Sequence, residues 1–292
     1  MDRRRFLAAT GSGVSLLPAG CRTTETVPDT ETTLELGETY ETVAGETITA
    51  ANVHIHRSAL YALDGYPPQV LVLPDRQLVF LTLLGTEPDA VFCEAGSFQL
   101  LLDDERYRGA TEVGDDVELA GVSLFHEFVH VPSPTDEEQA TVAWEVPLDV
   151  ASERVAVEWV GDDTTARWDW PDSRVRALRN PSRFRVEALD LPETFACDEP
   201  FGAAVRVAND GGRQGLFNAV VGPPELGRHH GWEWMSLRVP AGETAIWAEE
   251  LQYPPSRSDL TCDERTDSAT FELDWGIGTR TATSARRGTT ST

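Results

Sequence analysis

Residues 126–130 are the part of the sequence whose types and spacing match a catalytic motif. His126, Glu127 and His130 form the pattern H-E-x-x-H, in which two imidazoles bind zinc and the glutamate acts on a zinc-bound water. This chemistry needs a helix, because only there do positions i and i+4 share one face. The flanking sequence instead predicts a strand before the motif and has two prolines shortly after it, where a helix would end. A chance match on a strand or loop is therefore favoured, and a zinc-dependent hydrolase through His126-Glu127-Phe128-Val129-His130 is the alternative.

A second metal hypothesis rests on histidines that alternate along strands. His54 and His56 would share one face of a strand, and so would His126 and His130 if they lay on one. If the two strands were neighbours, four imidazoles could form a zinc or copper site. The alternative, which we favour, is that these histidines are solvated or lie at the edge of a core. We therefore expect no metal or other cofactor.

Two cysteines outside the leader could form a disulfide. Cys197 and Cys262 each come just before a predicted strand, and in an oxidising compartment an even pair favours a bridge. This bridge would close a loop of about 65 residues and stabilise the fold by about 4 kcal/mol in the chain-entropy model. The alternative is two separate buried thiols. Cys93 would be left over as a buried thiol.

The N-terminal stretch has the features of an export signal. Arg3 and Arg4, followed by Phe6 and Leu7 and then a short run of apolar and small residues, resemble a twin-arginine (Tat) signal. Residues 17–21 resemble a lipobox, in which cleavage before Cys21 leaves a thiol that carries lipid. Residues 1–20 are then a cleaved signal peptide. The alternative is an ordinary secreted protein whose Cys21 lies in the leader.

The charge of the chain indicates its environment. The formal net charge is −25, and all 24 basic residues are arginine. In molar salt the Debye length falls to about 3 Å, which screens the self-repulsion of such a chain. Dense Asp and Glu without Lys is typical of halophilic proteins, and the composition resembles those of halophilic archaea. This charge also argues against nucleic acid as a partner.

The rest of the sequence predicts an all-β protein. Short apolar or alternating runs recur between turns rich in Gly, Pro and Asp, as in β-sandwiches. We expect two immunoglobulin-like β-sandwich domains in tandem after the cleaved signal and a flexible tether. The expected boundaries are 21–32 for a Thr/Glu-rich tether, 33–170 for the first sandwich, 171–181 for a linker, 182–278 for the second sandwich and 279–292 for a disordered tail.

The order of motifs in 33–170 resembles a known family. Leu36-Gly37-Glu38 and Gly45–Thr49 precede the strand that contains Phe80, and Phe98–Asp103 and Trp144–Pro147 follow it. Together these resemble the telokin-like, immunoglobulin-related extracellular domains of prokaryotic lipoproteins. The resemblance implies a domain without catalytic activity.

The second half of the chain resembles a different family. An Asn209–Gly212 turn precedes the Gly215-Leu216-Phe217 strand, and Pro240–Thr244 leads into another strand. This order resembles the CARDB-like and fibronectin-like adhesive domains of archaeal surface proteins, over residues 182–278.

The one basic cluster of the chain lies at the expected linker. It consists of Arg174, Arg176, Arg179, Arg183 and Arg185. These arginines could receive an anionic partner. The favoured alternative is that they pair with carboxylates of the flanking domains at the junction.

These patterns together predict a protein at the extracellular face of the membrane, held by lipid at Cys21. We expect a non-catalytic binding, adhesion or spacer module whose partner is an envelope protein or polymer. The zinc hydrolase and the histidine-based metal-binding module are the alternatives.

Overall fold

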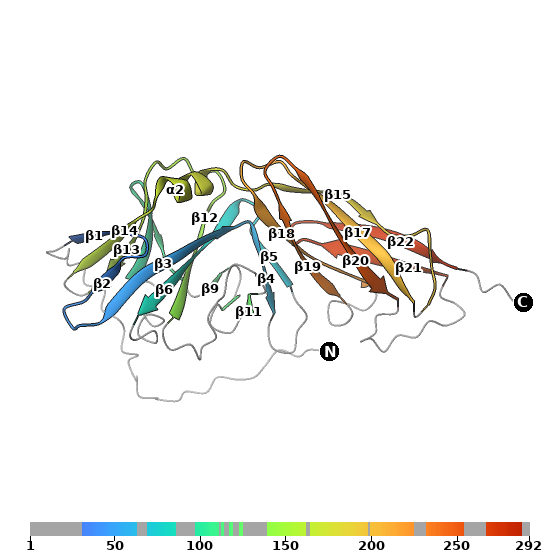
Figure 1. The fold of residues 1–292 in the computed structure, drawn as a ribbon, viewed down its shortest axis with the longest axis horizontal. Coiled ribbons are helices and arrows are strands. Elements are labelled where there is room, and N and C mark those ends of the chain that lie inside the picture. Colours follow the sequence, from blue (N-terminus) through green and yellow to red (C-terminus); the bar gives the residue numbers. More distant parts are fainter. Residues whose placement is uncertain are drawn as a thin grey trace, which may run out of the picture.

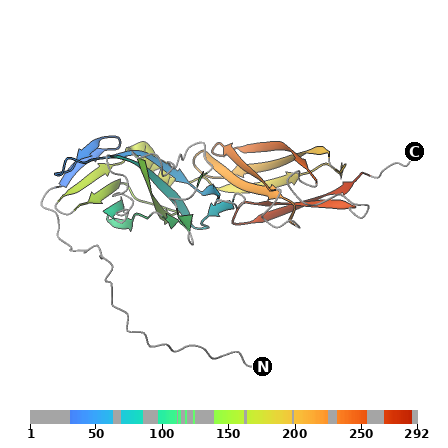
Figure 2. The same cartoon turned by 90° about the horizontal axis from the view of Figure 1, so that it is seen from below.

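The computed structural model consists of two β-rich lobes that lie end to end (Figures 1 and 2). The structure describes residues 31–62, 69–85, 97–110, 112–113, 117–118, 123–124, 139–161, 164–197, 199–224, 232–253 and 267–287. Nearly all described elements are strands, so the prediction of an all-β fold is confirmed. No helix in the described part of the chain is long and apolar enough to cross a membrane.

Two sheets face each other in the first lobe. One has the order β1-β14-β13-β7-β8 and the other the order β12-β6-β3-β2. Their strands are β1 (Glu31–Glu35), β2 (Thr39–Glu41), β3 (Thr47–His56), β6 (Arg76–Gly85), β7 (Phe98–Leu102), β8 (Glu105–Arg108), β12 (Gln139–Pro147), β13 (Val155–Val160) and β14 (Thr165–Asp169). β1 pairs with β14 in parallel over five residues, and β13 pairs with β14 and β7 in antiparallel fashion.

The core of the first lobe forms from alternate residues of these strands. Val142, Trp144 and Val146 of β12 are buried against Val157 and Trp168 of the opposite sheet, as a period of two requires. In β3 the register shifts at a bulge between Ala50 and Asn52. The buried positions accordingly change from 48 and 50 to 53 and 55, so the apolar side stays on the core despite the extra residue.

A hairpin covers the outer face of the β12-β6-β3-β2 sheet. It comprises β4 (Ser58–Ala62) and β5 (Gln69–Val72), and the short β11 (Ser123–Leu124) pairs with β4. Ala59 and Leu71 of the hairpin pack on Leu78 and Phe80 of β6. The nearly continuous apolar run of β6 is therefore buried on both faces, which is the burial that such a run indicates. Two further short strands, β9 (Glu112–Val113) and β10 (Val117–Glu118), pair with each other.

The second lobe is also a sandwich of two sheets. Their orders are β15-β17-β20 and β16-β22-β21-β18-β19. The strands are β15 (Phe184–Asp190), β16 (Thr194–Phe195), β17 (Pro200–Asn209), β18 (Gly215–Gly222), β19 (Glu233–Val239), β20 (Thr244–Gln252), β21 (Ser268–Asp274) and β22 (Thr279–Arg286). Val205 and Val207 from one sheet pack against Phe217, Val221 and Phe271 from the other.

The segment expected to be a linker contains a helix, α2 (Asp172–Arg179). Val175 and Leu178 lie one turn apart on its buried face and belong to the core of the first lobe. The buried Gln77 side chain holds the end of α2, because its Nε2 donates to the Leu178 carbonyl at 2.9 Å. The link between the lobes is thus a packed element of the first lobe.

Two boundary predictions are wrong, one by eight residues at the C-terminal tail and one by two residues at the tether. The tail expected to be disordered from 279 instead forms β22, since its Thr residues suit a strand and Ser284, fully buried, donates to the Pro192 carbonyl at 2.7 Å. The tether expected to run to residue 32 ends earlier, because Glu31 and Thr32 pair with Thr165 and Ala166.

Candidate functional site

Most of the residues predicted to carry function lie outside the described residues. These are Arg3, Arg4, Phe6, Leu7, Cys21, Cys93, His126, Glu127, His130 and Cys262. The H-E-x-x-H motif and the lipid-attachment site therefore stay predictions. Cys197 is described, and it is disulfide-bonded.

The two histidines of β3 lie as predicted on one face of the strand. The rings of His54 and His56 are stacked, with centroids 6.2 Å apart and an interplanar angle of 14°. Across the sheet they face Phe80 and Leu78 of β6. The described residues contain no group of three or more His, Cys, Asp or Glu side chains that could hold a metal ion.

The predicted arginine cluster divides into two parts. Arg183 forms an ion pair with Asp149 of the first lobe, and Arg185 pairs with Asp210 and Glu187 of the second. These pairs agree with the favoured interpretation of carboxylate pairing at the junction. Arg174 on α2 is exposed and makes no ion pair with any described carboxylate.

The two lobes meet at a corner where the chain passes from β3 to β4. Arg57 is the one residue between these strands, and its side chain is buried. Its guanidinium donates to the carbonyls of Leu73 at 3.0 Å and Pro74 at 3.1 Å, and to that of Arg76. Burial lowers the pKa of Arg57, and the positive charge of Arg183 lowers it further. The guanidinium therefore ties the corner to the turn that joins β5 to β6.

The hairpin that follows this corner packs on β18 of the second lobe. Leu60 of β4 is buried with Val220 and Trp232. Asn218 is 1% exposed, and its Nδ2 donates to the Ser58 carbonyl at 3.0 Å and to the Ser58 Oγ at 3.2 Å. A buried amide that hydrogen-bonds across the junction fixes the orientation of the lobes, because sliding would leave it unsatisfied.

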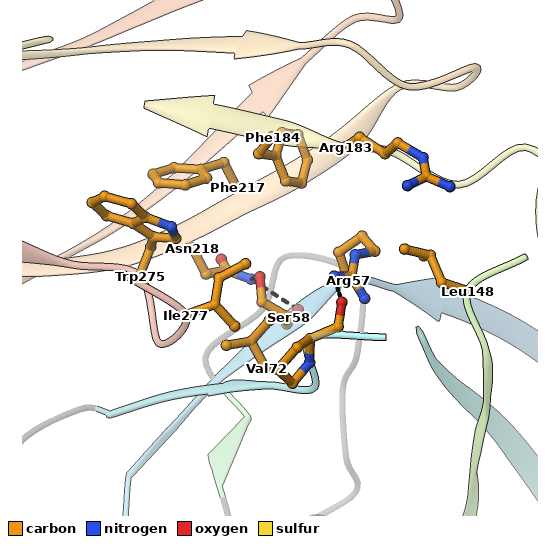
Figure 3. Close-up of a pocket in the computed structure, with 11 residues that line it drawn as sticks. Arg57, Ser58, Val72, Leu148, Arg183, Phe184, Phe217, Asn218, Trp275 and Ile277 are labelled. Atoms are coloured by element: carbon orange, nitrogen blue, oxygen red, sulfur yellow. Dashed lines mark hydrogen bonds between the residues drawn. The ribbon is translucent and has the colours of Figure 1, made fainter. Parts of the chain in front are cut away.

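A hollow lined by aromatic side chains lies on one side of the corner, with a volume of about 180 Å³ (Figure 3). Phe184 and Phe217 meet edge to face there, with ring centroids 5.6 Å apart. The polar groups at its floor, Asn218 and Ser58, already hydrogen-bond to each other. This hollow offers apolar contact rather than acid–base chemistry. Its lining is Arg57, Ser58, Val72, Pro74, Leu148, Arg183, Phe184, Phe217, Asn218, Trp275 and Ile277.

A second hollow, which we call the basic groove, also opens at the junction and has a volume of about 280 Å³. It shares Arg57 with the aromatic hollow. Residues from β3, α2, the start of β18 and β19 line it, so both lobes contribute. Its lining is Val53, His54, Ile55, His56, Arg57, Arg174, Ser182, Arg213, Gln214, Gly215, Leu216 and Arg238. None of the described residues that line it is Asp or Glu.

Arg213 has the largest pKa shift in the basic groove. Its Nη2 donates to the Ile55 carbonyl of the first lobe at 3.0 Å. Its Nε is buried and has no hydrogen-bond partner among the described residues. Burial, followed by the charge of Arg174, lowers the pKa of Arg213 to about 10. The guanidinium remains charged at neutral pH, and no described carboxylate pairs with it.

The pKa of His54 is lowered by the same two causes as that of Arg213. Burial and the charge of Arg174 lower the pKa of His54 below its ordinary value of 6.5. The imidazole is therefore neutral at neutral pH, with one N–H available to donate. The charge of Arg174 thus acts on both His54 and Arg213, and all three line the same groove.

The basic groove is the feature that the sequence does not reveal. Arg213 stands 158 positions from Ile55, the residue that accepts its hydrogen bond, and no local pattern predicts their contact. Arg174 and His54 were singled out for other reasons, one within the arginine cluster and one within a histidine pair. The turn at Asn209–Gly212 directly before Arg213 was the only local signal, and it indicated a turn alone.

No family model matches this sequence, and no curated protein matches it. Among solved structures, the chain is similar to an uncharacterized beta-sandwich protein from Clostridium difficile 630, with 13% identity and a TM-score of 0.30 over 51% of this chain and 98% of that one. It is also similar to a calcium-binding mutant of Bacteroides uniformis beta-glucuronidase 2, with 11% identity and a TM-score of 0.21 over 80% of this chain and 33% of that one. This chain thus spans about a third of the latter's length, and at such TM-scores neither similarity assigns a family or a function.

Proposed function

We propose that this protein is a non-catalytic module displayed on the extracellular face of a halophile's membrane. Export through the Arg3-Arg4 signal and lipid on Cys21 would hold it there. The two sandwiches would act as a stiff support that presents the junction and the second lobe to an envelope protein or polymer. The resemblance of the two halves to telokin-like and CARDB-like surface domains supports this proposal.

The observation that carries the proposal is the position of β1 relative to the second lobe. β1 lies at the end of the first lobe that faces away from the second lobe (Figure 1). Glu31 comes ten residues after Cys21, and ten residues span at most about 35 Å. A lipid on Cys21 would therefore hold the far end of the first lobe close to the membrane, with the second lobe pointing outward.

Packing between the lobes makes such a support stiff. Contacts across the junction include the Leu60–Val220–Trp232 cluster and the buried Asn218 amide. Domains joined only by a flexible linker move independently, whereas a hydrophobic and hydrogen-bonded interface resists bending. A stiff link lets a surface module hold its binding face at a fixed distance from the membrane.

Substitutions in the leader test this proposal in the cells that make the protein. Cys21→Ser should release the protein from the membrane fraction into the medium, because the lipid-bearing thiol is lost. Arg3→Lys with Arg4→Lys should leave the uncleaved chain inside the cell. Arg5→Lys, which alters the residue next to the twin arginines, is the matched control and should leave export unchanged.

The readouts are immunoblots of membrane, medium and cytoplasm, with protease added to intact cells. Degradation of the membrane-bound wild-type protein by external protease is the expected result. Recovery of the wild-type protein in the cytoplasm would contradict export. Retention of the Cys21→Ser protein on the membrane would contradict lipid anchoring.

A further inference from the structure

We propose that the basic groove is a binding site for a small oxyanion, either a sulfate or a carboxylate group. The proposal depends on the residues of the groove alone. It would hold whether or not the protein carries lipid at Cys21.

The first argument is the contrast between the groove and the chain. Asp and Glu outnumber Arg in this protein by 49 to 24, so a surface depression of random composition would contain about two acids for each base. The described lining of the groove has four arginines, two histidines and no acid. Like charges brought together repel each other, so a fold with so many carboxylates would be expected to intersperse them here. A bound anion offsets that repulsion.

The second argument is the state of Arg213. Buried arginines are ordinarily paired with carboxylates or fully hydrogen-bonded, because desolvating a lone charge is costly. The Nε of Arg213 is buried without a partner, and among the described residues only the Ile55 carbonyl accepts from this guanidinium. The guanidinium still has donors in a planar fork that suits two oxygens of one anion. The groove thus holds a charge for which the described part of the chain supplies no counter-ion.

The third argument is that the surrounding structure fixes these donors in place. Arg174 projects from α2, whose Val175 and Leu178 are anchored in the core. Arg213 is tied to β3 through the Ile55 carbonyl. The backbone beside it is close-packed, since a Cβ on Gly215 would lie 2.4 Å from the Ser182 Oγ. Donors held in position before a ligand arrives lose little entropy on binding.

The size and charge of the groove define the ligand class. A volume of about 280 Å³ lies at the small end of ligand pockets, which suits a small ion or one acidic group. Positive charge excludes metal cations. Planar, directional donors from Arg213 and His54 favour an oxyanion with several acceptor atoms over a spherical halide.

Thermal unfolding of the purified full chain in matched salts tests the proposal. Sodium sulfate and sodium malonate are the oxyanion probes, and sodium chloride at equal ionic strength is the reference. Ligand that binds only the folded state raises the melting temperature with concentration. Sulfate also stabilises proteins nonspecifically, so the informative quantity is the difference between variants in the same salt.

The variants are Arg213→Met, Arg174→Met and, as the matched control, Arg206→Met. Arg206 lies on β17, is exposed, pairs with Asp190 of β15 and is absent from the groove lining. Calorimetric titration with sulfate should give at least tenfold weaker affinity for Arg213→Met and a smaller loss for Arg174→Met. The Arg206→Met variant should bind like the wild type. Arg174 is exposed on α2, so its variant is expected to fold even if Arg213→Met does not.

The sulfate and malonate experiments also distinguish a sulfate site from a carboxylate site. A response to malonate that exceeds that to sulfate identifies a carboxylate site, and the reverse identifies a sulfate site. Equal responses of all variants to sulfate would overturn the proposal. Binding of chloride as tightly as the oxyanions would also overturn it, because the groove would then hold an adventitious ion only.

Discussion

Arg57 and Arg213 are two arginines at one junction, and they differ in how many acceptors surround the guanidinium. Arg57 sits at the corner between β3 and β4, where three backbone carbonyls accept from its guanidinium. Arg213, two residues before β18, has one acceptor among the described residues and a buried Nε without a partner. Backbone carbonyls accept from the Arg57 guanidinium at three places, whereas Arg213 keeps N–H donors without an acceptor among the described residues.

This difference separates a structural arginine from a binding arginine without reference to any relative. A fully bonded buried cation stabilises the elements that it joins, and removing it leaves orphaned carbonyls. An uncompensated buried cation reduces stability in the free protein, and sites of this kind are retained where a ligand needs them. The two residues should therefore respond to the same substitution with opposite changes in stability.

The largest expected effect is that of Arg57→Met. Loss of this guanidinium leaves the buried carbonyls of Leu73, Pro74 and Arg76 without their donor, so the free energy of unfolding should fall by about 3 kcal/mol. Chemical denaturation followed by tryptophan fluorescence measures the change. Arg167→Met is the control, because Arg167 forms only a surface pair with Asp169, and it should change stability by less than about 1 kcal/mol. Equal effects of the two substitutions would mean that the corner does not depend on Arg57.

A smaller loss is expected for Gln77→Leu. The Gln77 amide joins β6 to the end of α2 through the Leu178 carbonyl and also reaches the Pro147 carbonyl. Leucine keeps the volume but removes both hydrogen bonds, which should lower the free energy of unfolding by about 1 to 2 kcal/mol. Because α2 carries Arg174, sulfate should also bind more weakly to this variant. Unchanged sulfate affinity would show that the position of α2 is not needed for the groove.

Arg213→Met should change stability in the opposite direction. Methionine removes the unpaired charge at the cost of one hydrogen bond to the Ile55 carbonyl, so the free energy of unfolding should rise by about 1 kcal/mol in chloride. The measurement is the denaturant concentration at the midpoint of unfolding. The two proteins are compared when the free energy of unfolding depends equally on denaturant concentration in both. A fall in stability as large as that of Arg57→Met would remove the distinction between the two arginines.

The smallest effect is the pH dependence contributed by His54. The titratable residues that line the groove with His54 are all basic: His56, Arg57, Arg174, Arg213 and Arg238. Because the pKa of His54 is lowered in the folded state, the imidazole is neutral in both states above about pH 6.5. Below that value the unfolded chain takes up the proton first, so stability falls as the pH falls through the folded pKa.

His54→Gln should remove this slope below about pH 6.5. Denaturation midpoints at a series of pH values from pH 8 to pH 5 measure it. Saturating sulfate should reduce the slope in the wild type, because a bound anion favours the protonated imidazole. An identical pH profile for wild type and variant would mean that His54 does not sense the charge of the groove.

Much of the fold could be predicted from local patterns, and the junction could not. Alternation of apolar residues in β12 and β14 is enough to place Trp144 and Trp168 in the core, and the continuous apolar run of β6 is typical of a strand covered on both faces. These inferences depend only on the fact that successive side chains of a strand point to opposite faces. The helix α2 was missed because its eight residues read as a polar, Arg-rich linker, and β22 was missed because Thr- and Ser-rich composition also occurs in disordered tails.

The basic groove depends on contacts between elements that are distant in sequence. Arg213 meets β3 only because the β4–β5 hairpin docks on β18, and that docking follows from the packing of Leu60 on Val220 and Trp232. The sequence showed the arginine cluster but not how its members divide. Arg183 and Arg185 pair with carboxylates, as favoured, while Arg174 lines the groove with Arg213, which no local pattern singles out.

The parallel pairing of β1 with β14 determines how the protein would bear mechanical load. Tension between an anchor upstream of Glu31 and the second lobe enters at the start of β1 and leaves beyond the end of β14, toward α2. In a parallel pair these two points lie at opposite ends of the ladder. The force then acts along the strands and strains all five paired positions at once, whereas an antiparallel pair pulled in this way would open one bond at a time. The first lobe is therefore built to resist pulling from its N-terminus.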